Sequence, residues 1–508
     1  MANIMGLDIG TSGCKALVFD SDGTLLASAS REYDVNFPYP QWAEQDLENV
    51  WQKAQAAMIE AIFLARVTVV AAIGLSVHGE AVTPVDDQGI PLRATILGMD
   101  TRTDTQNECL RAKYGGEELF HRTGMPIHTI NTLPKLLWIK ENEPEIWKQA
   151  NKFLLVEDFL IQKMTGKAVV SQCLASRTQM YDLTKGEWSN EILDFLDLDI
   201  NHLAEVQPSG SVVAEMHSAL AAFLGLSLRP LVITGGHDQA CGALGVGLTQ
   251  LGLAMVSTGT AEVVEVVLDS PVLSKPLYEG NFSVYNHVVP GLYLAMTLNH
   301  SGGMVLRWFR DSFYDSHLAE SDRFGKNAYD LILGSESREP TGLLVLPHFS
   351  GSGTPTFDTQ SKGAILGLTF STSRSDIAYA MIEGLTYELR LNLDLLMDGG
   401  VHIDVLRAIG GGAKSALWLQ MKADITGIPV VKPKITEAAG FGAALLAGTG
   451  AGIYPSAEVA ANKFLKLTAE YHPDPTRQTV YNRNYDLYRQ VYPAISPITQ
   501  KIISKFKK

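Results

Sequence analysis

The same short pattern occurs twice in this chain, about 250 residues apart, and it limits the possible folds more than any other feature. In the first copy, the apolar run Ile4–Asp8 leads through a turn rich in glycine, serine and threonine into a second apolar run, Ala16–Phe19. In the second copy, Ala254–Ser257 leads through Thr258–Gly259–Thr260 into Val263–Val267. Two apolar runs joined by such a turn are typical of a β-hairpin. The spacing is too long for a solenoid repeat and predicts two similar domains that face each other.

Between the two hairpins, strand and helix patterns alternate. Apolar residues at helical spacing predict a helix over Leu47–Leu64, and Val67–Leu75 has the pattern of a buried strand. The alternation continues to about residue 247 and predicts a mostly parallel sheet of the α/β class. Tyr481–Lys508 has a helical pattern with a basic tail, which we interpret as a solvated helix end. The sequence thus predicts two domains, residues 1–248 and 249–508, with the boundary inferred from the recurrence alone.

The charge of the chain excludes several classes of partner. There are 41 lysines and arginines against 55 aspartates and glutamates, so the net charge is −14 and the pI is about 5.4. An acidic chain binds polyanions poorly, so neither nucleic acid nor an anionic membrane is expected as a main partner. ATP remains compatible, because backbone N–H groups and a metal ion can hold phosphates locally.

The cysteines and the most apolar segments indicate an ordinary soluble protein. The four cysteines form no CxxC pair, which argues against a disulfide scaffold and against a thiolate metal site. The N-terminus has no signal-peptide pattern, and the most apolar stretch, Val67–Val77, is too short to cross a bilayer. We therefore expect a cytoplasmic location.

The first hairpin carries the residue types of a phosphate site, although the chain has no Walker-type GxxxxGK[ST] and no GxGxxG. Asp8 closes the first strand, and Gly10, Thr11, Ser12 and Lys15 follow. Glycine allows a tight turn to bring N–H groups and hydroxyls onto a phosphate chain, and an acid at a strand end can hold Mg²⁺ directly or through water. A plain β-turn would have the same pattern, so that alternative stays open. The second hairpin alone is weaker evidence for a phosphate site. Two such hairpins in one chain are stronger evidence than either one.

An acid follows two glycines in Gly235–Asp238, where the predicted strand Leu231–Thr234 ends and a helix begins. Asp238 could be a simple helix N-cap. However, Gly242 and Gly245 indicate close backbone packing, and an acid at this strand end would project into a cleft. A carboxylate placed there can accept a hydroxyl proton during phosphoryl transfer.

Three consecutive glycines, Gly410–Gly412, follow the predicted strand Val405–Ile409. Without side chains they would form a bare surface on which a flat base could lie. A loop followed by a capped helix is the alternative interpretation.

These four motifs, in this order, resemble the FGGY family of carbohydrate kinases, in the actin/hexokinase-like ATPase superfamily. The resemblance covers nearly the whole chain. Gly363–Leu368, continued by Asp376–Glu383, is similar to the C-terminal signature of the family, and Leu133–Asn142 is similar to the N-terminal one. Trp42–Asp46 and Glu437–Gly442 also resemble family segments.

The resemblance implies an α/β fold of two actin/hexokinase-like (ribonuclease H-like) ATPase domains that flank a catalytic cleft, with the sugar on the first domain and ATP on the second. It implies that Asp238 is the catalytic base and that Asp8 is the acid on the Mg²⁺ side. The implied ATP-binding residues are Gly10, Thr11, Ser12, Lys15, Thr258, Gly259, Thr260, Gly411, Gly412, Ala413 and Ser415. The implied substrate-binding residues are His78, Gly79, Glu80, Asp100 and Gln239.

The substrate loop departs from the better-known members of the family. Xylulokinases usually have Q-M-H-G here, whereas this chain has His78 two positions before that histidine and Glu80 in its place. Glycerol kinases usually have R-E, so Glu80 matches their glutamate while Gly79 replaces the arginine. Gly98 stands where both groups usually have tryptophan. Autoinducer-2 kinases also have a glutamate and lack the tryptophan, and Leu306–Asp311 resembles their sequence.

We therefore expect an ATP- and Mg²⁺-dependent kinase that phosphorylates a hydroxyl of a small sugar, with a ketose such as xylulose as the first candidate. A polyol of the glycerol or erythritol type, or an autoinducer-2-like compound, is the alternative substrate, and a non-kinase actin-like ATPase is the alternative from another class. Structural roles also stay open: His78 as a satisfied core histidine and Glu80 as a solvated surface acid. The oligomeric state stays open, with a homodimer as the one arrangement considered.

Overall fold

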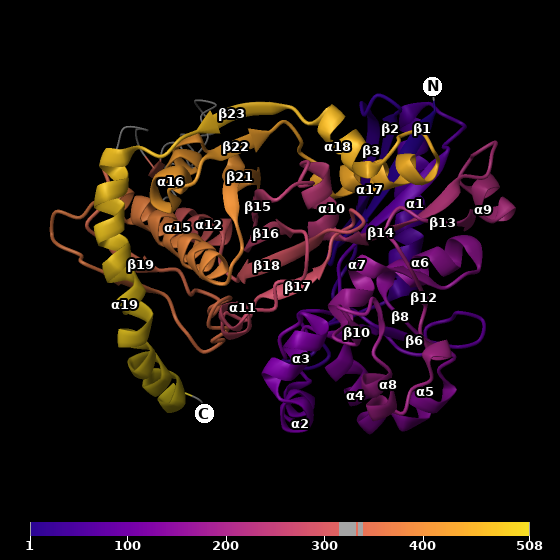
Figure 1. The fold of residues 1–508 in the computed structure, drawn as a ribbon, viewed down its shortest axis with the longest axis horizontal. Coiled ribbons are helices and arrows are strands. Elements are labelled where there is room, and N and C mark those ends of the chain that lie inside the picture. The colour runs from indigo at the N-terminus through magenta and orange to yellow at the C-terminus, as the bar shows by residue number, and fades with distance from the viewer. Residues whose placement is uncertain (1, 314–331, 334–338, 507–508) are drawn as a thin grey trace.

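The chain forms two lobes, each built around one large mixed β-sheet (Figure 1). The computed structural model describes residues 2–313, 332–333 and 339–506. We call the part around the six-stranded sheet the first lobe and the part around the seven-stranded sheet the second lobe. The α/β class predicted from the sequence is confirmed, because helices alternate with the strands of two large sheets.

The sheet of the first lobe begins with the predicted hairpin. Its strands, in spatial order, are β13 (Val212–Glu215), β14 (Leu231–His237), β5 (Ala72–Val77), β1 (Asn3–Ile9), β2 (Gly13–Asp20) and β3 (Leu25–Glu32). Strands β14, β5 and β1 are parallel, but β1–β2, β2–β3 and β13–β14 are antiparallel. The prediction of a mostly parallel sheet is therefore wrong, because a chain that begins as a hairpin and a tight turn necessarily starts an antiparallel meander.

The second lobe repeats this plan around its own hairpin. Its sheet has the order β17 (Ser283–Asn286), β18 (Tyr293–Asn299), β16 (Glu262–Leu268), β15 (Gly252–Thr258), β21 (Ile403–Gly410), β22 (Val430–Pro433) and β23 (Leu467–Tyr471). Strands β15 and β16 form the predicted second hairpin, and β15 is parallel to β21. Short two-stranded sheets lie outside the two large ones: β4 (Glu44–Gln45) with β7 (Thr95–Ile96), β6 (Thr83–Val85) with β8 (Lys152–Leu154), β9 (Val169–Ser171) with β12 (Glu205–Gln207), β10 (Tyr181–Asp182) with β11 (Glu187–Trp188), and β19 (Leu344–Leu346) with β20 (Ala364–Leu366).

Helices cover the two sheets, and local sequence accounts for several of their ends. Helix α1 (Leu47–Ala65) matches its prediction closely: the Asp46 side chain accepts hydrogen bonds from two N–H groups of the first turn, and Arg66 ends the helix in the left-handed conformation. The other helices of residues 1–245 are α2 (Asp104–Tyr114), α3 (Gly116–Thr123), α4 (Thr132–Asn142), α5 (Pro144–Gln149), α6 (Val156–Thr165), α7 (Gln172–Ala175), η1 (Ser176–Thr178), α8 (Asn190–Leu196), η2 (Ile200–His202), α9 (Ser218–Phe223) and α10 (Asp238–Gly245).

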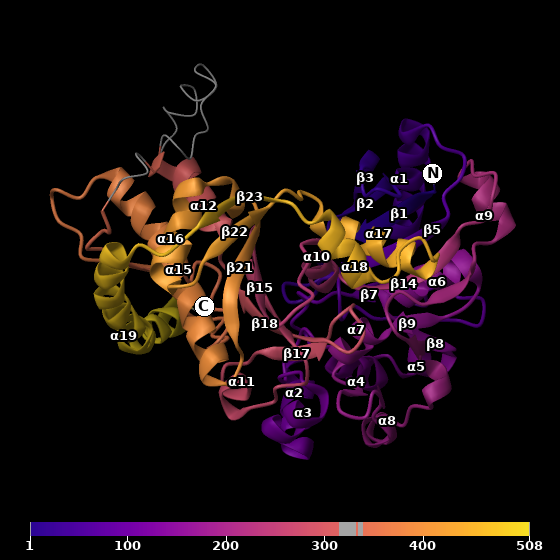
Figure 2. The same cartoon turned by 45° about the horizontal axis from the view of Figure 1, so that its top comes forward.

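In the second half of the chain, α15 (Arg374–Asp398) and α16 (Ala416–Thr426) lie outside the second sheet, with α19 (Pro475–Phe506) beyond them (Figure 2). The predicted C-terminal helix thus begins earlier, at Pro475. The remaining helices are α11 (Lys275–Glu279), α12 (Gly303–Phe313), η3 (Gly412–Lys414), α17 (Ala438–Gly450) and α18 (Ala457–Phe464). No helix among the described residues is long and apolar enough to span a membrane.

Helices α17 and α18 cross back from the second sheet and lie on the first lobe (Figures 1 and 2). Helix α17 packs against β1, β5 and β14 and against α10. Glycine permits this approach: a Cβ on Gly442 would lie 1.9 Å from the carbonyl oxygen of Cys241, and a Cβ on Gly6 would lie 1.9 Å from that of Gly440. The boundary at residue 248 stays a prediction, and in space the later helices α17 and α18 belong to the first sheet.

Candidate active site

A pocket between the lobes brings together residues from all four sequence motifs. Strands β1, β5 and β14 are parallel, so Ile9, Val77 and His237 end at the same edge of the first sheet. Thr258 and Gly410 pair at the corresponding edge of the second sheet. Ligands of α/β sheets bind at such carboxyl edges. The pocket is lined by Asp8, Gly10, Asp238, Gln239, Gly242, Met255, Ser257, Ile409, Gly410 and residues 436–439.

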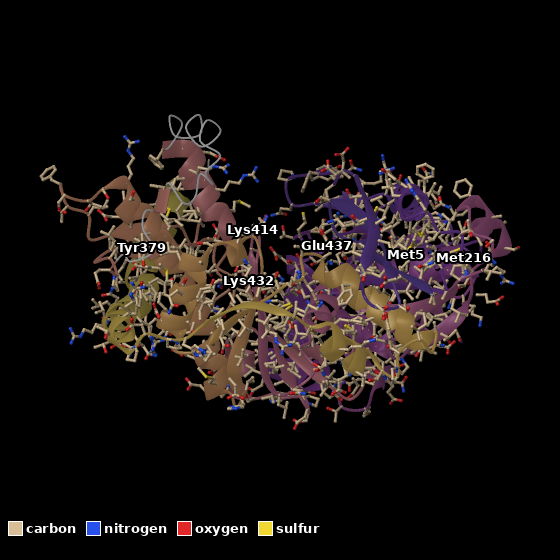
Figure 3. All side chains as sticks on the ribbon, turned by 90° about the horizontal axis from the view of Figure 1, so that it is seen from above. Met5, Met216, Tyr379, Lys414, Lys432 and Glu437 are labelled. Carbon is tan, nitrogen blue, oxygen red and sulfur yellow. The ribbon has the colours of Figure 1, made fainter. Side chains whose placement is uncertain are left out.

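The first hairpin places Asp8 in this pocket. Its Oδ1 accepts a hydrogen bond of 2.7 Å from the hydroxyl of Ser76, and burial raises the pKa of Asp8 against the opposing effects of Ser76 and Lys15. Lys15 forms an ion pair of 2.7 Å with Glu437. Glu437 lies where the chain returns to the first lobe (Figure 3). The turn itself is tight, with the N–H of Gly10 bonded to the carbonyl of Gly13 at 2.9 Å.

Asp238 is the first residue of α10, and the N-cap position is held by His237. Its Oδ1 accepts from the backbone N–H of Gln239 at 2.6 Å and lies 3.3 Å from Nε2 of His237. Within the described part of the chain no hydrogen bond reaches Oδ2, and the side chain is 29% exposed. The pKa of Asp238 is raised to about 7, chiefly by burial and next by the charge of Asp8. A carboxylate with this pKa is well suited to accept a proton near neutral pH.

The second hairpin and the three glycines form one packed unit around Thr258. Gly410 has φ +81°, and a Cβ there would lie 2.6 Å from the carbonyl oxygen of Thr258. A Cβ on Gly412 would lie 2.8 Å from Cβ of Thr258, whereas a Cβ on Gly411 would meet nothing closer than 3.8 Å. Only Gly411 therefore presents an open face. Ala413 is buried, and the Ser415 side chain caps α16 by accepting from the N–H of Trp418, so the alternative of a capped helix is also realised.

The hydroxyl of Thr258 points into the protein. It donates to Oε2 of Glu262 at 2.6 Å and accepts from Nζ of Lys422 at 3.1 Å. The neighbouring Gly259 and Thr260 are tied by their carbonyls to the N–H groups of Gly303 and Gly302, at the start of α12. The predicted phosphate contacts of residues 258–260 stay a prediction, and in this structure the Thr258 hydroxyl is not offered to the pocket.

The predicted substrate loop, residues 78–80, lies beside the residue that precedes Asp238. A Cβ on Gly79 would lie 2.9 Å from Cδ2 of His237, so the loop touches the residue next to Asp238. Burial and the charge of Lys135 lower the pKa of His78 to about 4, so its imidazole is neutral. Nε2 of His78 is buried and has no hydrogen-bond partner among the described residues, so the alternative of a satisfied core histidine is not supported.

Glu80 is buried, with 4% of its side chain exposed, so the alternative of a solvated surface acid is wrong. Its backbone has φ +62°, and its carbonyl accepts from Thr132 and from Nζ of Lys135 at 3.0 Å. Its Oε1 is bonded by Nε and Nη2 of Arg177. Among the described residues no hydrogen bond reaches Oε2, which therefore remains an acceptor for a ligand hydroxyl.

Asp100 is fully buried and its carboxylate already has protein partners. Arg102 binds both oxygens, and the N–H of Ala43 donates to Oδ2 at 2.7 Å. The guanidinium of Arg102 is in turn stacked on Trp42, 3.7 Å from the ring centre. The predicted sugar contact of Asp100 stays a prediction, and in this structure its geometry is that of a buried ion pair.

Several buried residues at the site were missed by sequence reasoning. Arg177 is 1% exposed and stacks on Tyr285 of the second lobe at 4.5 Å. Tyr285 donates to Glu265, whose pKa burial raises to about 8. Arg177 lies in none of the sequence motifs. Of these residues, only Lys135 could have been found from the sequence, because it lies in the segment that resembles the N-terminal family signature. Arg177, Lys135, Glu262 and Lys422 all act through contacts between distant segments.

The carboxylates of the pocket fit a magnesium ion. Mg²⁺ binds oxygen ligands and usually takes one or two carboxylates together with substrate phosphates and water. Asp8 and Asp238 line the same pocket, which suits that pattern. The described residues hold no group of three or more His, Cys, Asp or Glu side chains that could form a complete protein cage.

Comparison with family models decides the family. The model of the N-terminal domain of the FGGY family of carbohydrate kinases matches residues 3–245, and that of the C-terminal domain matches residues 254–451. The chain belongs to the FGGY family of carbohydrate kinases. The xylulose kinase of Staphylococcus epidermidis (strain ATCC 12228) is 31% identical over 510 residues, which cover 99% of this chain and 98% of that protein.

Solved structures show the same FGGY fold. A "xyloylose kinase" from Brucella ovis is 28% identical, with a TM-score of 0.88 over 98% of this chain and 100% of that one. A glycerol kinase from Plasmodium falciparum, solved with ADP, is 23% identical, with a TM-score of 0.86 over 96% and 98%. As an FGGY kinase, the protein is a phosphotransferase with an alcohol acceptor, and its family uses ATP and a sugar substrate.

Proposed function

We propose that this FGGY kinase transfers the γ-phosphoryl group of ATP to a hydroxyl of a ketose of the xylulose type. The observation that carries the reaction is the single pocket that holds Asp8 and Gly10 of the first hairpin, Asp238 of α10, and Ser257 and Gly410 of the second sheet. The full-length similarity to xylulose kinases supports the choice of sugar. The family assignment argues against the alternative of a non-kinase ATPase. The presence of Asp238 and of both hairpins argues in the same direction.

In the proposed mechanism, Asp238 orients the acceptor hydroxyl and takes its proton. Its free Oδ2 and its pKa of about 7 suit that task. The hydroxyl oxygen then attacks the γ-phosphorus in line, while N–H groups of the two hairpins stabilise the shifting charge. Asp8 would hold Mg²⁺, which when bound neutralises charge on the phosphates. The first hairpin, with Gly10, Thr11, Ser12 and Lys15, holds the phosphates from one side.

On the sugar side, the substrate loop offers acceptors rather than donors. We infer that Oε2 of Glu80 accepts from a sugar hydroxyl, since Arg177 leaves that oxygen free. His78 and Gln239 are the other proposed sugar contacts, and Gly79 keeps the loop in contact with His237. Gly98 stands where other members have tryptophan, and it packs near Ile130: a Cβ there would lie 3.4 Å from Cγ1 of Ile130.

A coupled ADP-release assay tests the function. The purified protein is given Mg²⁺, ATP and, in turn, ketopentoses, ketohexoses, polyols and autoinducer-2-like diones. We expect ADP release to depend on a ketopentose. Release that depends only on a polyol or a dione would overturn the substrate, and ATP hydrolysis that ignores every acceptor would overturn the kinase reaction.

Replacing Gly411 by valine is expected to raise the KM for ATP by about tenfold or more, with little change in the KM for the sugar. The open face of Gly411 is where we place the base or ribose of ATP, and a loss of about 1.4 kcal/mol of binding energy is a factor of ten. Steady-state kinetics with each substrate varied in turn measures the split. An equal change in both KM values would remove Gly411 from the nucleotide site.

Replacing Glu80 by glutamine is expected to raise the KM for the sugar by about 10- to 100-fold, because a buried polar contact left unpaired costs about 1–3 kcal/mol. ADP affinity, measured by calorimetry, should not change, because Glu80 lies on the first lobe. Glu108→Gln is the matched control, since that side chain is 74% exposed in a surface ion pair. A normal sugar KM in Glu80→Gln would show that Glu80 serves the loop and not the sugar.

A further inference from the structure

A buried pair of opposite charges lies directly beneath the second hairpin. Lys422, on α16, contacts Oε2 of Glu262, at the start of β16, and each side chain is 1% exposed. Both also bind the hydroxyl of Thr258, at the end of β15. Three groups from three separate elements thus bind one another directly.

The hydrogen bonds fix the direction of the Thr258 hydroxyl. Its single proton goes to Glu262, and its oxygen accepts from the ammonium of Lys422. The side chain of Thr258 is also the surface on which Gly412 packs, because a Cβ on Gly412 would lie 2.8 Å from Cβ of Thr258. The cluster of Lys422, Glu262 and Thr258 therefore joins the hairpin to the glycine loop that follows β21.

Burial of two charges is not explained by stability alone. Moving an ion pair out of water costs free energy, and apolar side chains of the same volume often stabilise a fold at least as well. What an ion pair with a shared hydroxyl adds is a defined geometry, since the ammonium, Oε2 of Glu262 and the hydroxyl fix one another's positions. The other carboxylate oxygen, Oε1, is buried with no hydrogen-bond partner among the described residues. This cluster holds the second hairpin and the glycine loop together. The proposed function places ATP on these same two elements.

We propose that Lys422 and Glu262 are positioning residues of the nucleotide site, which hold Thr258 so that the second hairpin and the glycine loop stand in the arrangement that receives ATP. Neither side chain reaches the pocket, so neither is a catalytic residue. The inference rests on the proposed function, because it requires ATP to lie on the second lobe.

Calorimetric titration with ADP and Mg²⁺ tests the proposal without a sugar, and thermal unfolding is followed for every variant. In Lys422→Met, ADP affinity is expected to fall at least tenfold. The double variant Lys422→Met/Glu262→Met removes both charges, so it should unfold near the wild-type temperature and still bind ADP at least tenfold more weakly. Should it fail to fold, the milder Glu262→Gln keeps the shape of the side chain and is expected to weaken ADP binding as well.

The matched control is a second buried lysine. Lys135 is fully buried like Lys422, but it binds the carbonyls of Glu80 and Ile130 on the first lobe. Lys135→Met should therefore leave ADP affinity unchanged. A folded double variant that binds ADP as the wild type does, or a Lys135→Met variant that loses ADP equally, would overturn the proposal. A wild-type protein that fails to bind ADP would instead overturn the proposed function.

Discussion

Replacing Asp238 by asparagine is expected to slow phosphoryl transfer by about two to four orders of magnitude, the usual contribution of a general base. The amide has nearly the same shape as the carboxylate and can still accept from the N–H of Gln239, so α10 should begin at the same residue. It cannot accept the proton of the sugar hydroxyl. The measurement is kcat at saturating ATP and sugar.

Two observations separate loss of the base from loss of the fold. ADP binding and the thermal unfolding temperature should stay near their wild-type values in Asp238→Asn. Asp104→Asn makes the same chemical change in the first turn of α2, at an exposed position away from the pocket, and should have no effect on kcat. A variant at position 238 with wild-type kcat would mean that Asp238 only shapes the start of the helix.

Replacing Gly442 by alanine is expected to destabilise the protein by about 2 kcal/mol, the upper overpacking cost less the gain in helix propensity. The new methyl carbon would lie 1.9 Å from the carbonyl oxygen of Cys241, and that oxygen belongs to the backbone of α10, which cannot rotate aside. Overpacking usually costs about 1–3 kcal/mol, while alanine adds back only about 1 kcal/mol of helix propensity over glycine. The clash therefore exceeds the gain.

Urea unfolding monitored by circular dichroism measures this effect. Gly342→Ala is the matched control. A Cβ at position 342 would meet nothing within 4 Å, and the backbone of Gly342 is not in the left-handed conformation that favours glycine. Activity should fall together with stability in Gly442→Ala, since α10 carries Asp238. Wild-type stability in that variant would show that α10 and α17 can separate without cost.

The sequence by itself determined the parts of this protein that depend on neighbouring residues. Apolar runs on either side of small-residue turns predicted both hairpins. Apolar residues at helical spacing predicted α1 with nearly its observed first and last residues. The acids Asp8 and Asp238 were predicted at strand ends, and they do line one pocket. Such features follow from local turn chemistry and periodicity, which act over a few residues.

Only the tertiary structure decided which partner each polar group has. The sequence could not show that Arg177 binds Glu80 across 97 positions, or that Lys422 binds Glu262 across 160. It also could not show that the N–H of Ala43 binds Asp100 across 57 positions, or that α17 returns to the first sheet. A buried charge takes whatever opposite charge the packing brings to it, and packing joins segments whose separation along the chain carries no periodic signal.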